Sequence, residues 1–167
     1  MAHFAGPARR RLASFTVPSV PGNERLAIAR VAGAVAGEGI AARRLERLKT
    51  AVAEATLNAI EHGNGNDPRT GVDIEVLRAG PDIVVTVTDT GGGRASAGPA
   101  EDPDLAAKLA GEQDARGWGL FLIRHMVDAM DVTTDGRRHT VWLTMRVPAP
   151  GDGGGGGCGR AVAAGGD

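Results

Sequence analysis

The chain has 167 residues, which predicts one domain, and its 19 basic and 20 acidic side chains leave a formal net charge of -1. This balance, with no basic stripe interleaved with aromatic residues, argues against nucleic acid as a direct partner. A lone Cys158 excludes an intramolecular disulfide, and no apolar run reaches the length of a signal or membrane segment, so we expect a cytoplasmic protein without membrane contact.

The first half of the chain is predicted to contain one strand and two helices. Residues 12–18 have the β-branched and aromatic content of a strand, which Pro18, Pro21 and Gly22 end. A helix is expected over 23–39, with Asn23 as a candidate N-cap. A second helix over 41–62 places aliphatic side chains on one face at the helical period, and Gly63 is a natural C-cap.

The second half of the chain is predicted to contain two strand pairs that flank a loop and a helix. Strands at 72–76 and 82–89 suggest a hairpin. Residues 91–116 form a long irregular loop, with a short helical possibility near 104–110, and such loops are often functional lids. Helical spacing resumes over 119–130. Two further strands, joined by a turn at Gly136, complete the chain.

The predicted order is therefore β-α-α-β-β-lid-α-β-β. Because the strands come in adjacent pairs, we expect an α+β fold, a two-layer sandwich with helices on one face of a mainly antiparallel sheet. Aromatic residues make up only 3% of the chain, so the core should consist mainly of Ala, Val, Leu and Ile. The expected segments are a flexible stretch at 1–11, a domain at 12–147 and a disordered glycine-rich tail at 148–167.

Glu54 and Asn58 stand four positions apart on the second helix. Four residues turn a helix by about 400°, so the two side chains lie about 40° apart on one face. Their face lies roughly opposite the aliphatic one. An isolated pair of this kind is most often a solvated face. The alternative is a metal and nucleotide site, in which the amide oxygen binds Mg²⁺ and the carboxylate is a ligand or a general base.

Two glycine-containing motifs offer further candidate sites. Asp89, Gly91 and Gly93 form a D-x-G-x-G motif directly after a strand, where the acid could accept a hydrogen bond from an exocyclic amine or simply end the strand. Gly117 and Gly119 open the third helix. Free N–H groups and the positive end of the helix dipole favour an anion there, although an ordinary glycine-containing helix start is about equally expected.

Taken in order, these motifs resemble those of a known superfamily. The segments "EATLNAIEHG", "TDTGGG", "RGWGLFLIRHMVD" and "HTVWLTM" resemble the N box, G1 box, G2 box and closing threonine strand of the histidine kinase-like ATPases. The amino-acid sequences of the first and third segments are most similar to those of the anti-sigma-factor serine kinase branch. The resemblance covers about residues 12–147 and implies that the long loop is an ATP lid.

The resemblance also implies residue roles. Asn58 would coordinate the Mg²⁺ that bridges the triphosphate, Glu54 would be the general base for a hydroxyl, and Asp89 would bind the adenine amino group. Thr140 would assist Asp89 from the neighbouring strand. The residues implied in lid movement and phosphate binding are Gly91, Gly93, Arg116, Gly117 and Gly119. The chain departs from the family pattern at Arg94 and at His139, where glycine often precedes the closing threonine.

The function implied is that of an ATP-binding anti-sigma regulatory factor. It would bind a sigma factor and phosphorylate a serine on a small STAS-type anti-anti-sigma protein, and the family implies dimerisation. One alternative is a non-catalytic switch that uses ATP only to set its affinity for a partner. A third, an isolated sensor-kinase ATPase domain, is disfavoured because the accessory helices with a phospho-accepting histidine are missing.

Overall fold

The computed structural model describes residues 8–91 and 115–148. Five strands and four helical segments follow one another along the chain. They are β1 (Arg9–Pro18), α1 (Glu24–Val35), α2 (Ala42–Asn58), the π-helical turn η1 (Ala59–Gly63), β2 (Gly71–Ala79), β3 (Asp82–Asp89), α4 (Ala115–Met126), β4 (Ala129–Asp135) and β5 (Arg138–Arg146).

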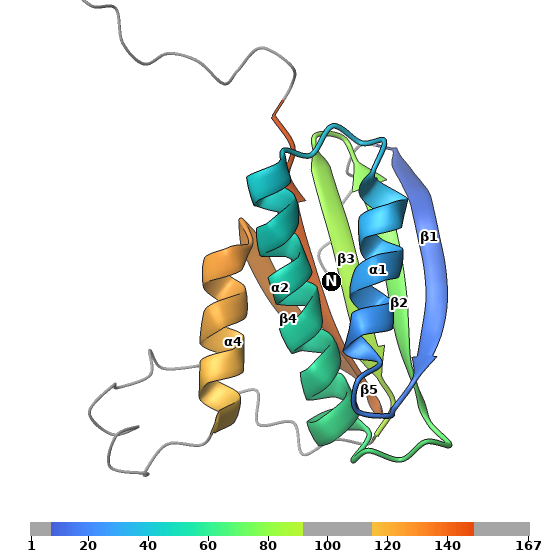
Figure 1. Cartoon of the computed structure of the whole chain (residues 1–167). Helices are drawn as coiled ribbons and strands as arrows, with labels where there is room; N and C mark the ends of the chain where they lie inside the picture. Colours follow the sequence, from blue (N-terminus) through green and yellow to red (C-terminus); the bar gives the residue numbers. More distant parts are fainter. Residues whose placement is uncertain (1–7, 92–114, 149–167) are drawn as a thin grey trace, which may run out of the picture.

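The strands form one antiparallel sheet in the order β1-β2-β3-β5-β4. Helices α1, α2 and α4 lie on one face of this sheet, and α2 runs between the other two (Figure 1). This arrangement confirms the predicted α+β sandwich. None of the described helices is long and apolar enough to cross a membrane.

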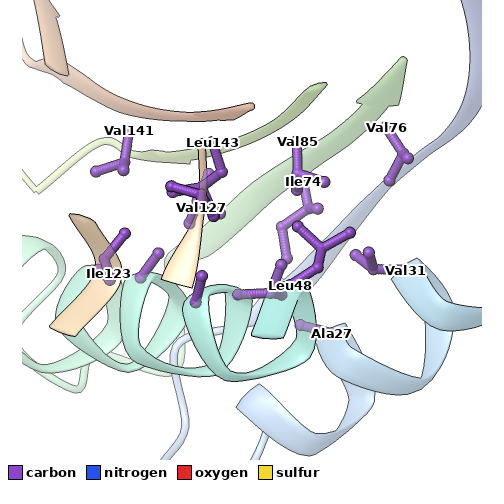
Figure 2. Packing of buried hydrophobic residues seen from close by; sticks show 14 of the residues in the cluster. Ala27, Val31, Leu48, Ile74, Val76, Val85, Ile123, Val127, Val141 and Leu143 are labelled. Carbon is purple, nitrogen blue, oxygen red and sulfur yellow. The ribbon is translucent and has the colours of Figure 1, made fainter. Parts of the chain in front are cut away.

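The core fills the space between the helices and the sheet, and it is aliphatic, as the composition predicts. Strand residues that alternate along the chain, such as Ile74, Val85 and Leu143, point toward the helices (Figure 2). Leu48 of α2 and Ile123 of α4 meet them from the helical layer, and all five side chains are at most 1% exposed. The face of α2 that carries Leu48 is therefore fixed against the sheet.

Several element boundaries differ from the sequence prediction; α1, for example, ends at Val35 and not at residue 39. Strand β1 begins at Arg9, because the segment 9–11, expected to be flexible, pairs with the end of β2. Helix α4 ends at Met126 instead of continuing to 130, and β4 begins at Ala129. The helix was predicted too long because apolar residues continue at a spacing of three or four across this junction. Met130 packs against the core, but it does so from a strand. The expected helix near 104–110, the glycine-rich tail from residue 149, and residues 1–7 lie outside the described residues.

The junction between α4 and β4 is held by the carboxylate of Asp128. Its Oδ2 accepts hydrogen bonds from Arg44 Nη1 of α2 at 2.8 Å and from the backbone N–H of Arg146 at 2.6 Å. Burial alone would raise the pKa of Asp128, but these two hydrogen bonds and the charges of Arg44 and Arg47 hold the pKa below its usual value. The ionised carboxylate therefore stabilises the fold.

We expect Asp128→Asn to lower the free energy of unfolding at pH 7 by about 1 kcal/mol, because the side chain is 40% exposed and its charged hydrogen bonds are partly screened. The folded-state pKa is lowered, so this contribution is present above the unfolded pKa of about 3.9 and disappears as pH falls through the folded pKa. Urea unfolding at pH 7 and pH 3.5 should show the difference from wild type shrinking in acid.

Asp131→Asn is the matched control, because Asp131 is an exposed carboxylate of the adjoining strand β4 without a side-chain partner among the described residues. An equal loss in both variants would contradict the role given to Asp128.

Candidate functional site

The first part of the site lies where α2 and α4 meet. Glu54 and Asn58 are half-buried on the side of α2 that does not face the core. Gly119 of α4 lies directly against them, since a Cβ at this position would be 3.1 Å from Asn58 Nδ2 and 3.4 Å from Glu54 Oε2. A larger residue at 119 would push α4 away from these two side chains. The structure therefore brings together the first and third sequence motifs.

The amide of Asn58 is not fully satisfied by the protein. Its Nδ2 is buried and has no hydrogen-bond partner in the part of the chain that the structure describes. The carboxylate of Glu54 has no hydrogen bond or ion pair there either. Buried polar groups are rarely left unpaired in native proteins, and an exception often marks a place where a ligand completes the bonding.

Helix α2 continues into the π turn η1, whose register is set by a bond from the backbone N–H of Asn64 to the carbonyl of Ala59 at 2.8 Å. Five residues of α-helix rotate the chain by about 500°, which leaves residue 63 about 140° away from residue 58. A π turn closes over five residues, so it returns Gly63 toward the face of Asn58. Single π turns are frequent at functional sites.

Gly63 does not act as the left-handed C-cap that the sequence predicted, because its φ is not positive; Gly65 takes that conformation, with φ of 63°. Gly63 is instead required by a close approach. A Cβ on Gly63 would lie 2.5 Å from Oδ2 of Asp89, and a Cβ on Gly91 would overlap the carbonyl group of Gly63. These two glycines let the π turn pack directly on the end of β3.

The second part of the site is therefore Asp89, the last residue of β3. Asp89 is only 4% exposed, and its Oδ1 has no hydrogen-bond partner among the described residues. Its Oδ2 lies 3.5 Å from Nδ1 of His139 on β5. A buried carboxylate oxygen without a partner is costly, so this oxygen is suited to accept a hydrogen bond from a ligand.

Thr140, which the sequence analysis placed beside Asp89, lies on the opposite face of the sheet. In the β3–β5 register Asp89 is opposite His139, and Thr88 is opposite Thr140. The hydroxyl oxygens of Thr88 and Thr140 are 2.9 Å apart on the face away from the helices. Side chains alternate along a strand, so the expected position of Thr140 beside Asp89 is wrong by one residue, and His139 lies there instead.

Asn64 supports this end of the sheet, and the sequence analysis did not single it out. Its buried side chain donates to Ser19 Oγ at 2.8 Å and to the carbonyl of Gly71 at 3.0 Å, and it accepts from the N–H of Thr90 at 3.1 Å. Asn64 thus joins the ends of β1 and β3 to the start of β2 immediately behind Asp89. The only sequence signal for this role is the position of Asn64 directly after Gly63, the last residue of "EATLNAIEHG".

The start of α4 is the place predicted to bind phosphate. The helix begins at Ala115, so Arg116 and Gly117 lie in its first turn, where backbone N–H groups have no partner within the helix. Gly119 lies one turn further, and its importance comes from its contact with Asn58 and Glu54. Gly93, the other predicted hinge residue of the lid, lies outside the described residues.

The donor set limits how a metal could be held. Within the described ranges, no cluster of three or more His, Cys, Asp or Glu side chains could form a metal cage. Mg²⁺ commonly takes one or two protein oxygens and completes its shell with phosphate and water. The oxygens of Asn58 and Glu54 fit that pattern, and the unpaired Oδ1 of Asp89 fits an amine donor.

Comparison with known sequences agrees with this geometry. Residues 17–145 match the family model of the histidine kinase-like ATPase domain. An anti-sigma F factor from Oceanobacillus iheyensis is 30% identical over 135 residues, which cover 80% of this chain and 91% of the relative. An anti-sigma F factor from Anoxybacillus flavithermus is 33% identical over 110 residues, which cover 66% of this chain and 74% of the relative.

Two solved structures share the fold. The RsbU and RsbW domains of Rv1364c from Mycobacterium tuberculosis match with a TM-score of 0.58 and 18% identity, over 83% of this chain and 33% of that longer chain. The SiaB-SiaC complex from Pseudomonas aeruginosa matches with a TM-score of 0.55 and 16% identity, over 81% of this chain and 90% of the matched chain. At these identities the likeness concerns the fold alone.

We expect Gly91→Ala to lower the free energy of unfolding by about 1–3 kcal/mol, because the new methyl group would overlap the backbone of Gly63 and force the two segments apart. The control is Gly33→Ala in α1, where a Cβ would meet nothing within 4 Å. This control should stabilise the protein by up to about 1 kcal/mol, since alanine is the better helix former. Urea unfolding of both variants measures the contrast, and similar effects at the two positions would contradict the close approach.

Proposed function

The chain belongs to the histidine kinase-like ATPase family, and from this premise we propose that it binds ATP with Mg²⁺ and acts as an anti-sigma regulator with serine/threonine kinase activity. One observation carries the proposal. The structure brings Gly119 against Glu54 and Asn58, while the π turn after Asn58 packs on Asp89. The groups needed for a base, a metal and a purine amine therefore meet at one end of α2.

Each of these residues has a role that its surroundings support. The unpaired Oδ1 of Asp89 would accept a hydrogen bond from the adenine amino group. The amide oxygen of Asn58 would be the protein ligand of Mg²⁺, and the first turn of α4, with Arg116 and Gly117, would hold phosphate oxygens. When bound, ATP supplies the transferable phosphoryl group, and Mg²⁺ offsets its negative charge.

Glu54 is the residue that distinguishes a kinase from a module that only binds nucleotide. Its carboxylate lies one helical turn before Asn58, beside Gly119, and no partner within the described residues engages it. A free carboxylate at this place can accept the proton of an incoming serine or threonine hydroxyl. Nucleotide binding alone does not require a base, so the presence of Glu54 supports phosphoryl transfer.

The names of the relatives support the choice of partners. Both sequence relatives quoted above are named anti-sigma F factors. By analogy, the partners proposed here are a sigma factor and a small STAS-type antagonist protein that carries the accepting hydroxyl. Dimerisation of the chain, which the family also implies, stays a prediction.

We expect Glu54→Gln to reduce phosphoryl transfer by about 10²- to 10⁴-fold while ATP affinity stays near that of wild type, because the substitution removes only the base. Asn58→Ala should weaken Mg-ATP binding itself. Transfer is measured with [γ-³²P]ATP and purified STAS-domain proteins from the same genome, and binding is measured by calorimetry. Phosphoamino acid analysis identifies the labelled hydroxyl.

Glu61→Gln is the matched control, since Glu61 is an exposed carboxylate of η1. Transfer by Glu54→Gln at the wild-type rate would refute the base. If wild-type protein binds ATP but labels none of these proteins, the non-catalytic switch replaces the kinase.

A further inference from the structure

The carboxylate of Asp89 is asymmetric in its surroundings. Oδ2 faces Nδ1 of His139 at 3.5 Å and lies so close to Gly63 that no side chain could stand at position 63. Oδ1 is buried and has no partner in the described part of the chain. The protein thus places an imidazole nitrogen beside one oxygen and leaves the other without a partner among the described residues.

This asymmetry has a chemical consequence for the choice of base. Adenine presents one amino group, at the 6-position, and one acceptor oxygen is enough to receive it. Guanine presents two parallel N–H donors, at N1 and at the 2-amino group. A carboxylate receives them with one donor to each oxygen, so a protein donor directed at one of these oxygens competes with guanine. A site that leaves a donor unpaired on binding loses much of its affinity for that ligand.

We propose that His139 is a specificity-determining residue that selects adenine over guanine, because its ring nitrogen stands beside Oδ2 of Asp89 and competes there with a second ligand donor. In the tautomer that carries hydrogen on Nδ1, His139 would direct this N–H toward Oδ2, and the β3–β5 register holds the two residues opposite each other. This inference rests on the proposed ATP site and adds to it the residue that sets the base preference. Thr140, one position along the strand, faces away and takes no part.

The test compares ATP and GTP affinities, measured by calorimetry with Mg²⁺, for wild type, His139→Ala, His139→Asn and Thr140→Val. Wild type should prefer ATP. His139→Ala frees Oδ2, so the ratio of the GTP to the ATP dissociation constant should fall by about tenfold, mainly through tighter GTP binding. Asparagine places an amide N–H close to the position of Nδ1, so His139→Asn should keep the wild-type ratio. Thr140→Val should also keep it.

Thermal melting by circular dichroism confirms that each variant is folded. A merely structural role for His139 would weaken both nucleotides equally and leave the ratio unchanged. An unchanged ratio in His139→Ala, with ATP still bound by wild type, overturns this inference and leaves the proposed function intact. A lowered ratio in Thr140→Val overturns it as well. If wild type binds neither nucleotide, the proposed function itself fails.

Discussion

The constraint on which the rest of the structure depends is the contact between the π turn at the end of α2 and the end of β3. Gly91 meets the backbone of Gly63 directly, and Gly63 in turn lies directly against the side chain of Asp89, because neither glycine has a side chain. The helix that carries Glu54 and Asn58 is thereby fixed against the strand that ends in Asp89. A loosely packed junction would let these groups drift apart, and a site needs its geometry held closely.

The pairing of β3 with β5 is the second determinant, because it decides which side chains share a face. Core residues such as Val141 and Leu143 point toward the helices, and the same alternation turns His139 to the helical side. The adjacent residue, Thr140, is turned outward and pairs with Thr88. A shift of one residue would exchange the two faces completely, so burial of the aliphatic residues also fixes the neighbour of Asp89.

Much of this architecture could be predicted from sequence, because it depends on local signals. Helical and strand periodicities gave the element order and the antiparallel sheet, and the spacing of Glu54 and Asn58 placed both on one face. What sequence could not provide were contacts between distant segments. The pairing of β1 from Arg9, the role of Asn64 and the position of His139 opposite Asp89 all depend on register and tertiary hydrogen bonds. The end of α4 was missed because one apolar spacing continued into a strand.

Helix α2 packs on the sheet with its aliphatic face and carries Glu54 and Asn58 on its polar face. The polar face lowers the stability of the fold. The buried Nδ2 of Asn58 and the buried Oδ1 of Asp89 have no hydrogen-bond partner in the described part of the chain. Each of these unpaired atoms lowers the stability of the fold. An apolar residue at position 58 would leave no unpaired amide N–H there, but it would also remove the proposed metal ligand. Any ligand that satisfies these atoms shifts the folding equilibrium toward the native state. If the proposed nucleotide is that ligand, the free energy of unfolding would rise with nucleotide concentration.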